Sequence, residues 1–252
     1  MLILSGHQPV YLPSIHLFSK IALSDAFLFV GHCQYVRKSW HTRNQIRLAD
    51  KALMLSVPVR KSNNLGQSIN ATQFSDNFWK RKHLSSIKQA YGKRPYFETY
   101  FPAVEALINQ PWETLGPMSM ALIKYFMDCL GINIPVYDSE DLGVEGHKTD
   151  MLISMCEHMQ ADQYLSNEGS RNYVQEELMA KKGIAHCWQG FKHPVYNQGR
   201  DTFIENMSVI DLLFNVGGEE AGRMVQESGW IEPGAFNIQA VKLIDKKGGP
   251  SA

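Results

Sequence analysis

Short apolar runs alternate with amphipathic stretches in the first part of the chain. Residues 2–6 and 26–31 are apolar runs of the length that buried strands favour. Between them, residues 14–25 carry apolar side chains at helical spacing, after Pro13 and with Ser14 as the candidate cap. A strand, a helix and a strand in this order predict a βαβ unit, whose strands run parallel with a right-handed crossover.

The next part of the chain predicts a hairpin followed by helices. Residues 42–48 and 52–59 flank a short turn, which favours an antiparallel pair of strands. Amphipathic and apolar stretches then predict helices at residues 75–92, 96–109 and 114–131. We expect these three helices to form an insertion beside the sheet, as a helical subdomain over about residues 75–130.

Strand and helix patterns alternate again in the second half, which predicts a further parallel β-α-β-α-β unit. The expected strands are residues 132–138, 163–167 and 184–188, and the expected helices are residues 146–160 and 170–183. Ser208 and Asp211 have capping-box spacing at the start of one more helix, residues 208–217. Periodicity is lost toward the end of the chain, where residues 245–252 are expected to fray.

These patterns together predict one α/β domain over residues 1–252. We expect a mostly parallel central sheet flanked by helices, with an antiparallel hairpin addition and a helical insertion. The carboxyl ends of such strands form the edge where open α/β sheets bind ligands.

Charge and cysteine content narrow the function classes. The 252 residues include 25 Lys and Arg and 25 Asp and Glu, so the formal net charge is zero and no nucleic-acid partner is indicated. The four cysteines form no CxxC pair, so no metal site is expected. No signal peptide and no apolar run near the roughly 20 residues of a membrane span is present, so we expect a cytoplasmic protein.

The loop after the first strand, residues 5–13, is stiff and rich in titratable groups. His7 follows the strand directly, at the edge where a histidine can act as a general base or bind a phosphate or carbonyl oxygen. Pro9 and Pro13 fix the loop and lower the entropy lost in holding His7 and Tyr11 in place. The alternative is structural: His7 donates to a backbone carbonyl, and the prolines turn the chain.

The clearest candidate anion site is a basic segment after the second strand. Arg37, Lys38 and Arg43 offer guanidinium and ammonium groups to phosphate or carboxylate, Trp40 can stack on a base or sugar, and Asn44 can make paired hydrogen bonds. This order of residues suits a nucleotide-sugar or another phosphorylated small molecule. A solvated basic loop with a core tryptophan is the alternative interpretation.

Sequence motifs across residues 3–218 resemble the WbqC-like family of bacterial polysaccharide-locus proteins. The resemblance rests on HQPVYLP, FSKI, the pair Ser-Asp, QY and WHTRNQI in the first part of the chain. YLSNEGSRNYV, HPVYNQ and SVIDLLFNVG follow in the expected order. It implies an enzyme of surface-glycan assembly, such as O-antigen formation, that acylates or aminoacylates an amino sugar, with glycine as one donor group. His32 stands where members of this family usually carry an acid.

Several further residues are site candidates at this stage. Besides His7, the catalytic candidates are Tyr11, Lys20 and Asp25, although a surface lysine and a turn aspartate are ordinary alternatives. Ser166 precedes the helix expected at residue 170, whose free N–H groups would favour an anion beside Arg171 and Tyr173. His193 is a candidate base for a nucleophilic Ser166. The remaining substrate-binding candidates are Gln8, Gln34, His83, Tyr196 and Gln198.

Three function classes stay open. The first is a transferase whose donor is an acyl-CoA, an acyl carrier or an acyl adenylate. The second is a nucleotide-binding enzyme of the HIGH type that uses ATP and Mg²⁺, although PSIHL lacks the glycine of H-x-G-H. The third is a non-catalytic module that binds a glycan precursor or partner enzymes, and a homo-oligomer is compatible with each.

Overall fold

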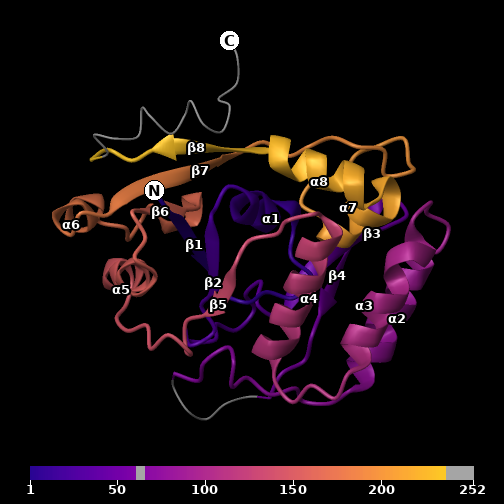
Figure 1. Ribbon diagram of the computed structural model, residues 1–252. Helices are drawn as coiled ribbons and strands as arrows, with labels where there is room; N and C mark the ends of the chain where they lie inside the picture. The colour runs from indigo at the N-terminus through magenta and orange to yellow at the C-terminus, as the bar shows by residue number, and fades with distance from the viewer. Residues whose placement is uncertain (61–65, 237–252) are drawn as a thin grey trace.

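The first strand lies inside the sheet. In the computed structural model, which describes residues 1–60 and 66–236, β1 (Ile3–His7) is a central strand of a six-stranded sheet (Figure 1). It pairs in parallel with β2 (Ala26–Phe29) on one side and with β6 (Gln163–Ser166) on the other. The predicted βαβ unit is confirmed, with α1 (Ile15–Ala22) as its crossover helix.

The remaining strands extend the sheet in the order β5-β2-β1-β6-β7-β8. β5 (Val136–Asp138) pairs in parallel with β2, and β7 (Ala185–Phe191) pairs in parallel with β6. β8 (Gly229–Pro233) is antiparallel to β7 and forms the edge. The predicted fold class, α/β with a mostly parallel sheet, is confirmed.

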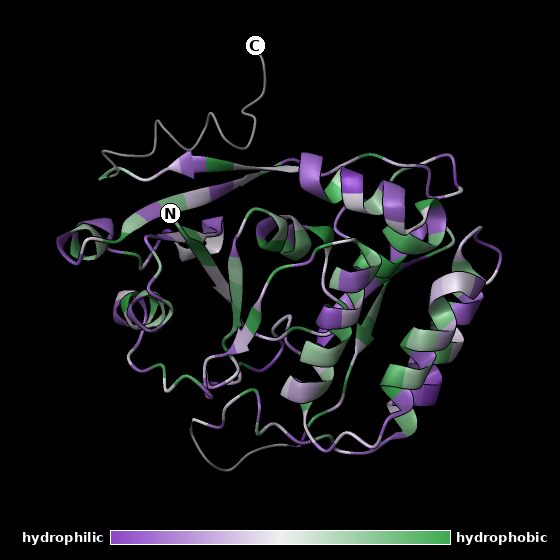
Figure 2. Cartoon of the chain, viewed as in Figure 1, coloured by the Kyte–Doolittle hydropathy of each residue, from purple (hydrophilic) through white to green (hydrophobic). Residues whose placement is uncertain are grey.

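Helices cover both faces of the sheet. On one side, α1 and α8 (Gly218–Glu227) contact each other and pack on β8. On the other side, α5 (Thr149–Met159) packs on β6 and α6 (Glu176–Lys181) packs on β7 (Figure 1). Figure 2 shows hydrophobic residues along β1 and β2, which are the strands buried between these layers.

A hairpin and four helices form a second group beside the sheet, and three of these helices are those of the predicted insertion. Its elements are β3 (Arg43–Leu48), β4 (Lys51–Ser56), α2 (Phe78–Tyr91), α3 (Phe97–Asn109), α4 (Leu115–Cys129) and α7 (Val209–Val216). β3 and β4 are antiparallel, and α2 and α7 both pack on β3. An extensive apolar core joins these elements to α1 and to the loop after β1.

The helix expected over residues 170–183 begins later in the structure. A 3₁₀ turn, Glu168–Ser170, follows β6, and α6 begins only at Glu176. Tyr173 holds the intervening turn, because its hydroxyl lies 2.9 Å from Oγ of Ser170 and its carbonyl oxygen accepts a 3.0 Å hydrogen bond from Thr149. The predicted helix N-terminus beside Ser166 was therefore wrong.

Two elements, α8 and β8, were not predicted from the sequence, and Asp211 has another role than the predicted one. Gly218 and Gly222 resemble loop punctuation in the sequence, but a Cβ on Gly222 would lie 2.4 Å from the carbonyl oxygen of Leu130. These glycines therefore allow α8 to approach the end of α4 closely. Asp211 does not complete a capping box, because its carboxylate binds Tyr196 and Gln198 instead.

Residues 245–252, expected to fray, lie outside the described residues. Within the described ranges, 1–60 and 66–236, none of the helices combines the length and apolar composition needed to cross a membrane.

Candidate functional site

A cavity lies between β1 and β6, where the order in which successive strands are added to the sheet reverses. β1 continues to β2 on one side, whereas β6 and β7 lie on the other, so the carboxyl ends of β1 and β6 flank a topological switch point. A cavity of about 330 Å³ is located there, and we call it the strand-end cavity. Its lining includes Gly6, His7, Gln8, Lys20, Ser166, Asn167, Gly169, Ser170 and Tyr173.

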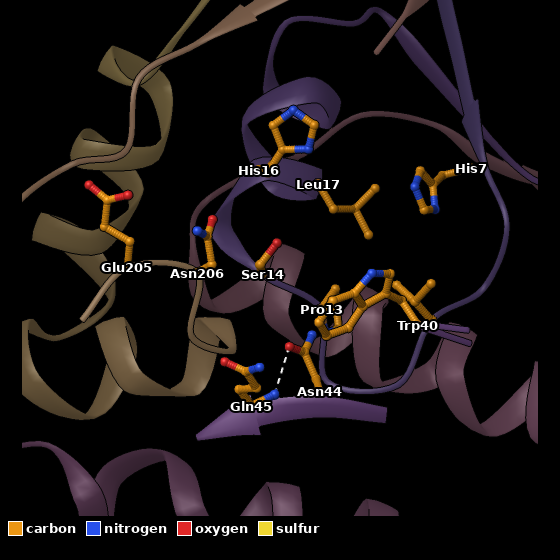
Figure 3. A pocket seen from close by; sticks show the side chains of 11 residues that line it. His7, Pro13, Ser14, His16, Leu17, Trp40, Asn44, Gln45, Glu205 and Asn206 are labelled. Carbon is orange, nitrogen blue, oxygen red and sulfur yellow. Dashed lines mark hydrogen bonds between the residues drawn. The ribbon is translucent and has the colours of Figure 1, made fainter. Parts of the chain in front are cut away.

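A second cavity adjoins the loop after β1, and we call it the loop cavity. It has a volume of about 550 Å³ and is lined by His7, Ser14, His16, Trp40, Asn44 and Asn206, among others (Figure 3). In Figure 3, the His7 ring and the Trp40 indole lie on the same side of this cavity, and His16 lies above Ser14 on α1. His7 is thus common to both cavities.

The protonation state of His7 follows from its surroundings. Nδ1 lies 2.7 Å from the carbonyl oxygen of Gln8. Because a carbonyl oxygen only accepts hydrogen bonds, Nδ1 carries the proton and Nε2 keeps its lone pair. Burial, together with the nearby Lys20, lowers the pKa of His7 to about 3. The ring is therefore neutral at physiological pH and offers Nε2 as a proton acceptor.

Lys20 is a buried residue that lines the strand-end cavity, so it is not the surface lysine of the alternative interpretation. Its side chain comes from α1, is 3% exposed, and donates a 2.8 Å hydrogen bond from Nζ to the carbonyl oxygen of Gly6. Burial lowers the pKa of Lys20 to about 7. In the part of the chain that the structure describes, no carboxylate lies within ion-pair distance of this ammonium group.

Gln8 connects the strand-end cavity to the basic segment. Its Oε1 lies 2.7 Å from Nε2 of the buried His41, and its backbone carbonyl holds His7. The backbone N–H of Tyr11 also donates to the carbonyl oxygen of His41. These contacts fix the loop after β1 against the residues that lead into β3.

Most of the predicted anion site lines a third cavity, which we call the basic cavity. It has a volume of about 590 Å³, and its lining includes Gln34, Arg37, Lys38, Arg43 and Arg60. Nε of Arg43 is buried and has no hydrogen-bond partner among the described residues. Clustered guanidinium groups of this kind favour phosphate or carboxylate.

Trp40 lines the loop cavity and contacts Arg43, a residue of the basic cavity. This residue is 53% exposed, and the centre of its ring lies 5.8 Å from Cζ of Arg43, a cation–π distance. Asn44 has a different role from the predicted ligand contact. Its Nδ2 donates to the carbonyl oxygen of Leu12 at 2.7 Å, and its Oδ1 accepts from the N–H of Gln45 at 2.8 Å. Its amide therefore holds the loop against β3.

Tyr11 and His83 pair with each other inside the core. The hydroxyl of Tyr11 lies 3.0 Å from Nδ1 of His83, and Trp79 contacts both rings. Burial raises the pKa of Tyr11 and lowers that of His83 to about 4. Both residues are absent from the linings of the strand-end and loop cavities, and their hydrogen bond joins the loop after β1 to α2.

Asp25 lies at the opposite edge of the sheet from His7. Its carboxylate accepts a 2.8 Å hydrogen bond from the N–H of Ile3, at the start of β1. The parallel register places the start of β2 beside the start of β1, so about 13 Å of strand separates Asp25 from His7. The expectation of a shared catalytic site for these two residues was therefore wrong.

The candidates after β6 are divided between the cavity and the surface. Ser166 and Tyr173 line the strand-end cavity. Arg171 is exposed, binds Glu168 at 2.6 and 2.7 Å, and stacks over the Trp188 ring at 4.4 Å. Its guanidinium is thus occupied by protein groups outside the cavity.

The three candidates of the HPVYNQ segment make internal contacts. Nε2 of His193 accepts from the N–H of Asn206 at 3.1 Å. The hydroxyl of Tyr196 and Nε2 of Gln198 both donate to Oδ2 of Asp211, at 2.7 and 2.8 Å. This buried network joins the segment to α7.

The structure brings Ser166 to a histidine that the sequence analysis did not select. Nε2 of His186, on β7, lies 2.9 Å from Oγ of Ser166, whereas the proposed partner His193 binds elsewhere. A polar residue within the apolar run IAHCW was the available signal. His32, the departure from the family pattern, lies 2.6 Å from Oγ of Ser139 through its Nδ1.

Comparison with known proteins supports the resemblance found in the sequence. A family model described as the WbqC-like protein family matches residues 8–223. The uncharacterized protein Rv1507c of Mycobacterium tuberculosis (strain ATCC 25618 / H37Rv) is 27% identical to this chain over 216 residues. That alignment covers 84% of this chain and 93% of the relative.

Proposed function

The chain belongs to the WbqC-like protein family, and from that premise we propose that it is a transferase of bacterial surface-polysaccharide assembly. The proposed reaction moves an activated acyl or aminoacyl group, such as a glycyl group, to the amino group of a nucleotide-linked or lipid-linked sugar. The donor is a thioester of coenzyme A or of a carrier, or an acyl adenylate.

The observation that carries the proposal is the position of the His7 imidazole. It lines both the strand-end cavity and the loop cavity, at the carboxyl end of β1. Its Nε2 is the nitrogen left free of a proton by the hydrogen bond to Gln8. Two substrates bound in the two cavities would therefore meet at a proton acceptor.

The proposed step uses this proton acceptor directly. The sugar amine attacks the carbonyl carbon of the donor, a carbon–nitrogen bond forms, and the bond from that carbon to the donor sulfur or oxygen breaks. Nε2 of His7 takes the proton of the attacking amine and returns it to the leaving group. Uncharged Lys20 favours this transfer, because its ammonium form opposes a second positive charge on His7.

The basic cavity supplies the site for phosphate groups in this proposal. Arg37, Lys38 and Arg43 would bind the diphosphate of the sugar substrate. Trp40, which lines the loop cavity and contacts Arg43, offers an exposed ring to a base or a sugar face.

Incubation with a panel of nucleotide amino sugars and acyl donors, followed by mass spectrometry, tests the proposal. We expect wild type to form an acylated sugar, and His7→Gln to form it at least about 100-fold more slowly while still binding the substrate. His158→Gln is the matched control, because this histidine is exposed at the end of α5. The proposal is wrong if no pair gives product, or if His7→Gln reacts as fast as wild type.

A second candidate function is nucleotide binding with adenylate or nucleotidyl transfer, as in HIGH-type enzymes. The observation in its favour is that His7 and His16 line one cavity beside the first turn of α1 (Figure 3). The ring N–H of His16 in this position can bind a phosphate oxygen. Under this alternative, ATP with Mg²⁺ raises the melting temperature, and His16→Asn reduces that increase. If an acylated sugar forms and ATP does not change the melting temperature, the transferase is favoured.

A further inference from the structure

Ser166 and His186 form a hydrogen-bonded pair at the wall of the strand-end cavity. Ser166 is the last residue of β6, and His186 lies near the start of the parallel neighbour β7. Oγ of Ser166 and Nε2 of His186 are 2.9 Å apart, and the residues are 2% and 3% exposed. A serine hydroxyl bonded to an imidazole is the arrangement that activates a serine for nucleophilic attack.

A carboxylate lies on the other side of the imidazole. Oε1 of Glu176, at the start of α6, is 3.8 Å from Nδ1 of His186. The same oxygen accepts a 2.8 Å hydrogen bond from Nε1 of Trp188, which fixes the carboxylate in place. A negative charge on this side favours the proton on Nδ1, so that Nε2 accepts the proton of Ser166.

Ser166 is the member of this group that reaches the cavity. It lines the strand-end cavity together with His7 and Lys20, whereas His186 and Glu176 lie behind it, outside the lining. Burial lowers the pKa of His186 to about 4, so its imidazole is neutral at pH 7 and able to accept a proton. The cavity therefore has the hydroxyl of Ser166 at the end of β6, with its base His186 on β7, and a second imidazole, that of His7, at the end of β1 on the other side of β6.

We propose that Ser166 is an acyl-accepting nucleophile, with His186 as its general base and Glu176 as the positioning residue. The proposal deepens the proposed transferase function and rests on it for the class of donor, an activated acyl ester or thioester. Acyl transfer then proceeds in two steps through a serine ester.

Both steps balance in atoms and protons. In the first step, Oγ attacks the acyl carbon, the bond from that carbon to the donor oxygen or sulfur breaks, and the hydroxyl proton passes through Nε2 of His186 to the leaving group. In the second step, the sugar amine attacks the serine ester and its carbon–oxygen bond breaks. The amine proton goes to Nε2 of His7 and passes through solvent to Nε2 of His186, which delivers it to Oγ and restores the hydroxyl.

Covalent labelling of the full chain tests the nucleophile. The protein is incubated with p-nitrophenyl acetate, and separately with a fluorophosphonate, and the intact mass and the modified peptide are determined. We expect a single adduct on Ser166, none on Ser166→Ala, and wild-type labelling of the control Ser119→Ala, a buried serine in α4. An adduct on another residue, or no adduct with either reagent, overturns the proposal.

Two further variants separate chemistry from folding. His186→Asn is expected to be labelled at least about 100-fold more slowly than wild type. Glu176→Gln is expected to shift the pH midpoint of labelling downward, because Glu176 raises the pKa of His186. A merely structural Glu176 would leave that midpoint unchanged. If Ser166→Ala fails to fold, the wild-type peptide map still decides the outcome.

The two proposals fail in different ways. If an acylated sugar forms but Ser166 carries no acyl group, transfer is direct, and only the serine proposal is wrong. If Ser166 is acylated but no amino sugar accepts the group, the nucleophile stands and the proposed acceptor is wrong.

Discussion

Nδ1 of His7 and the carbonyl oxygen of Gln8 lie 2.7 Å apart, so the backbone of the following residue determines which ring nitrogen carries the proton. The free nitrogen belongs to a ring that borders two cavities at the end of a central strand. This local contact thus leaves Nε2 unprotonated, and it does so through a backbone carbonyl oxygen rather than a carboxylate.

The first prediction concerns the tautomer and charge of His7. With a pKa lowered to about 3 by burial and by Lys20, the ring is expected to stay neutral with its proton on Nδ1 at pH 5. Nitrogen-15 NMR of the imidazoles, assigned by comparison with His7→Gln, measures this directly. A midpoint near 6.5, the ordinary value, would contradict the burial argument.

The second prediction concerns the stability of Lys20→Met. Because burial lowers the pKa of Lys20 from 10.5 to about 7, the unfolded chain binds more protons between these values, and the wild type gains stability as the pH rises. The variant lacks this gain. We expect it to be more stable than wild type at pH 6, and the difference to shrink by about 4 kcal/mol at most by pH 10. Urea denaturation at both pH values measures the difference.

The third prediction separates a structural from a ligand-binding role for Tyr196. Its hydroxyl donates to the buried carboxylate of Asp211, and Tyr196→Phe leaves that oxygen one donor short. We expect a loss of about 1–3 kcal/mol in unfolding free energy, with KM unchanged. Denaturation measures the stability and steady-state kinetics measure KM. Unchanged stability with a raised KM would indicate that Tyr196 contacts a ligand.

The fourth prediction concerns the basic cavity. Arg43→Gln removes a guanidinium from it and should weaken the binding of a nucleoside diphosphate about tenfold. Arg81→Gln, an exposed change on α2, is the matched control and should bind as wild type does. Isothermal titration calorimetry at two salt concentrations tests both. Equal affinities for the two variants would place the phosphate groups elsewhere.

Local patterns predicted the elements better than their contacts. The spacing of apolar residues was sufficient for β1, α1, β2 and the hairpin, because each depends on residues close in sequence. It failed for α8, whose buried face depends on two glycines that approach the end of α4. A glycine in a packed helix and a glycine in a turn look alike until the partner surface is known.

The candidate site shows the same division. The position of His7 at this edge of the sheet was predictable, because the first apolar run leads directly to this residue, which ends β1. Asp25 was misplaced, because it directly precedes the strand predicted at residues 26–31, and the predicted parallel pairing already put the start of that strand at the opposite edge from His7. The pairing of Ser166 with His186 depends on β6 and β7 being neighbours, which follows from the strand order of the whole sheet.

The buried ammonium group of Lys20 has a consequence for ligand recognition. An anion that enters the strand-end cavity stabilises the charged form of this lysine, which burial otherwise disfavours. Complex formation near neutral pH would then draw hydrogen ions from the medium, and the heat of association would vary with the ionisation enthalpy of the buffer. Acidification would tighten such a complex, so that the binding of an anion in this cavity would be coupled to proton uptake.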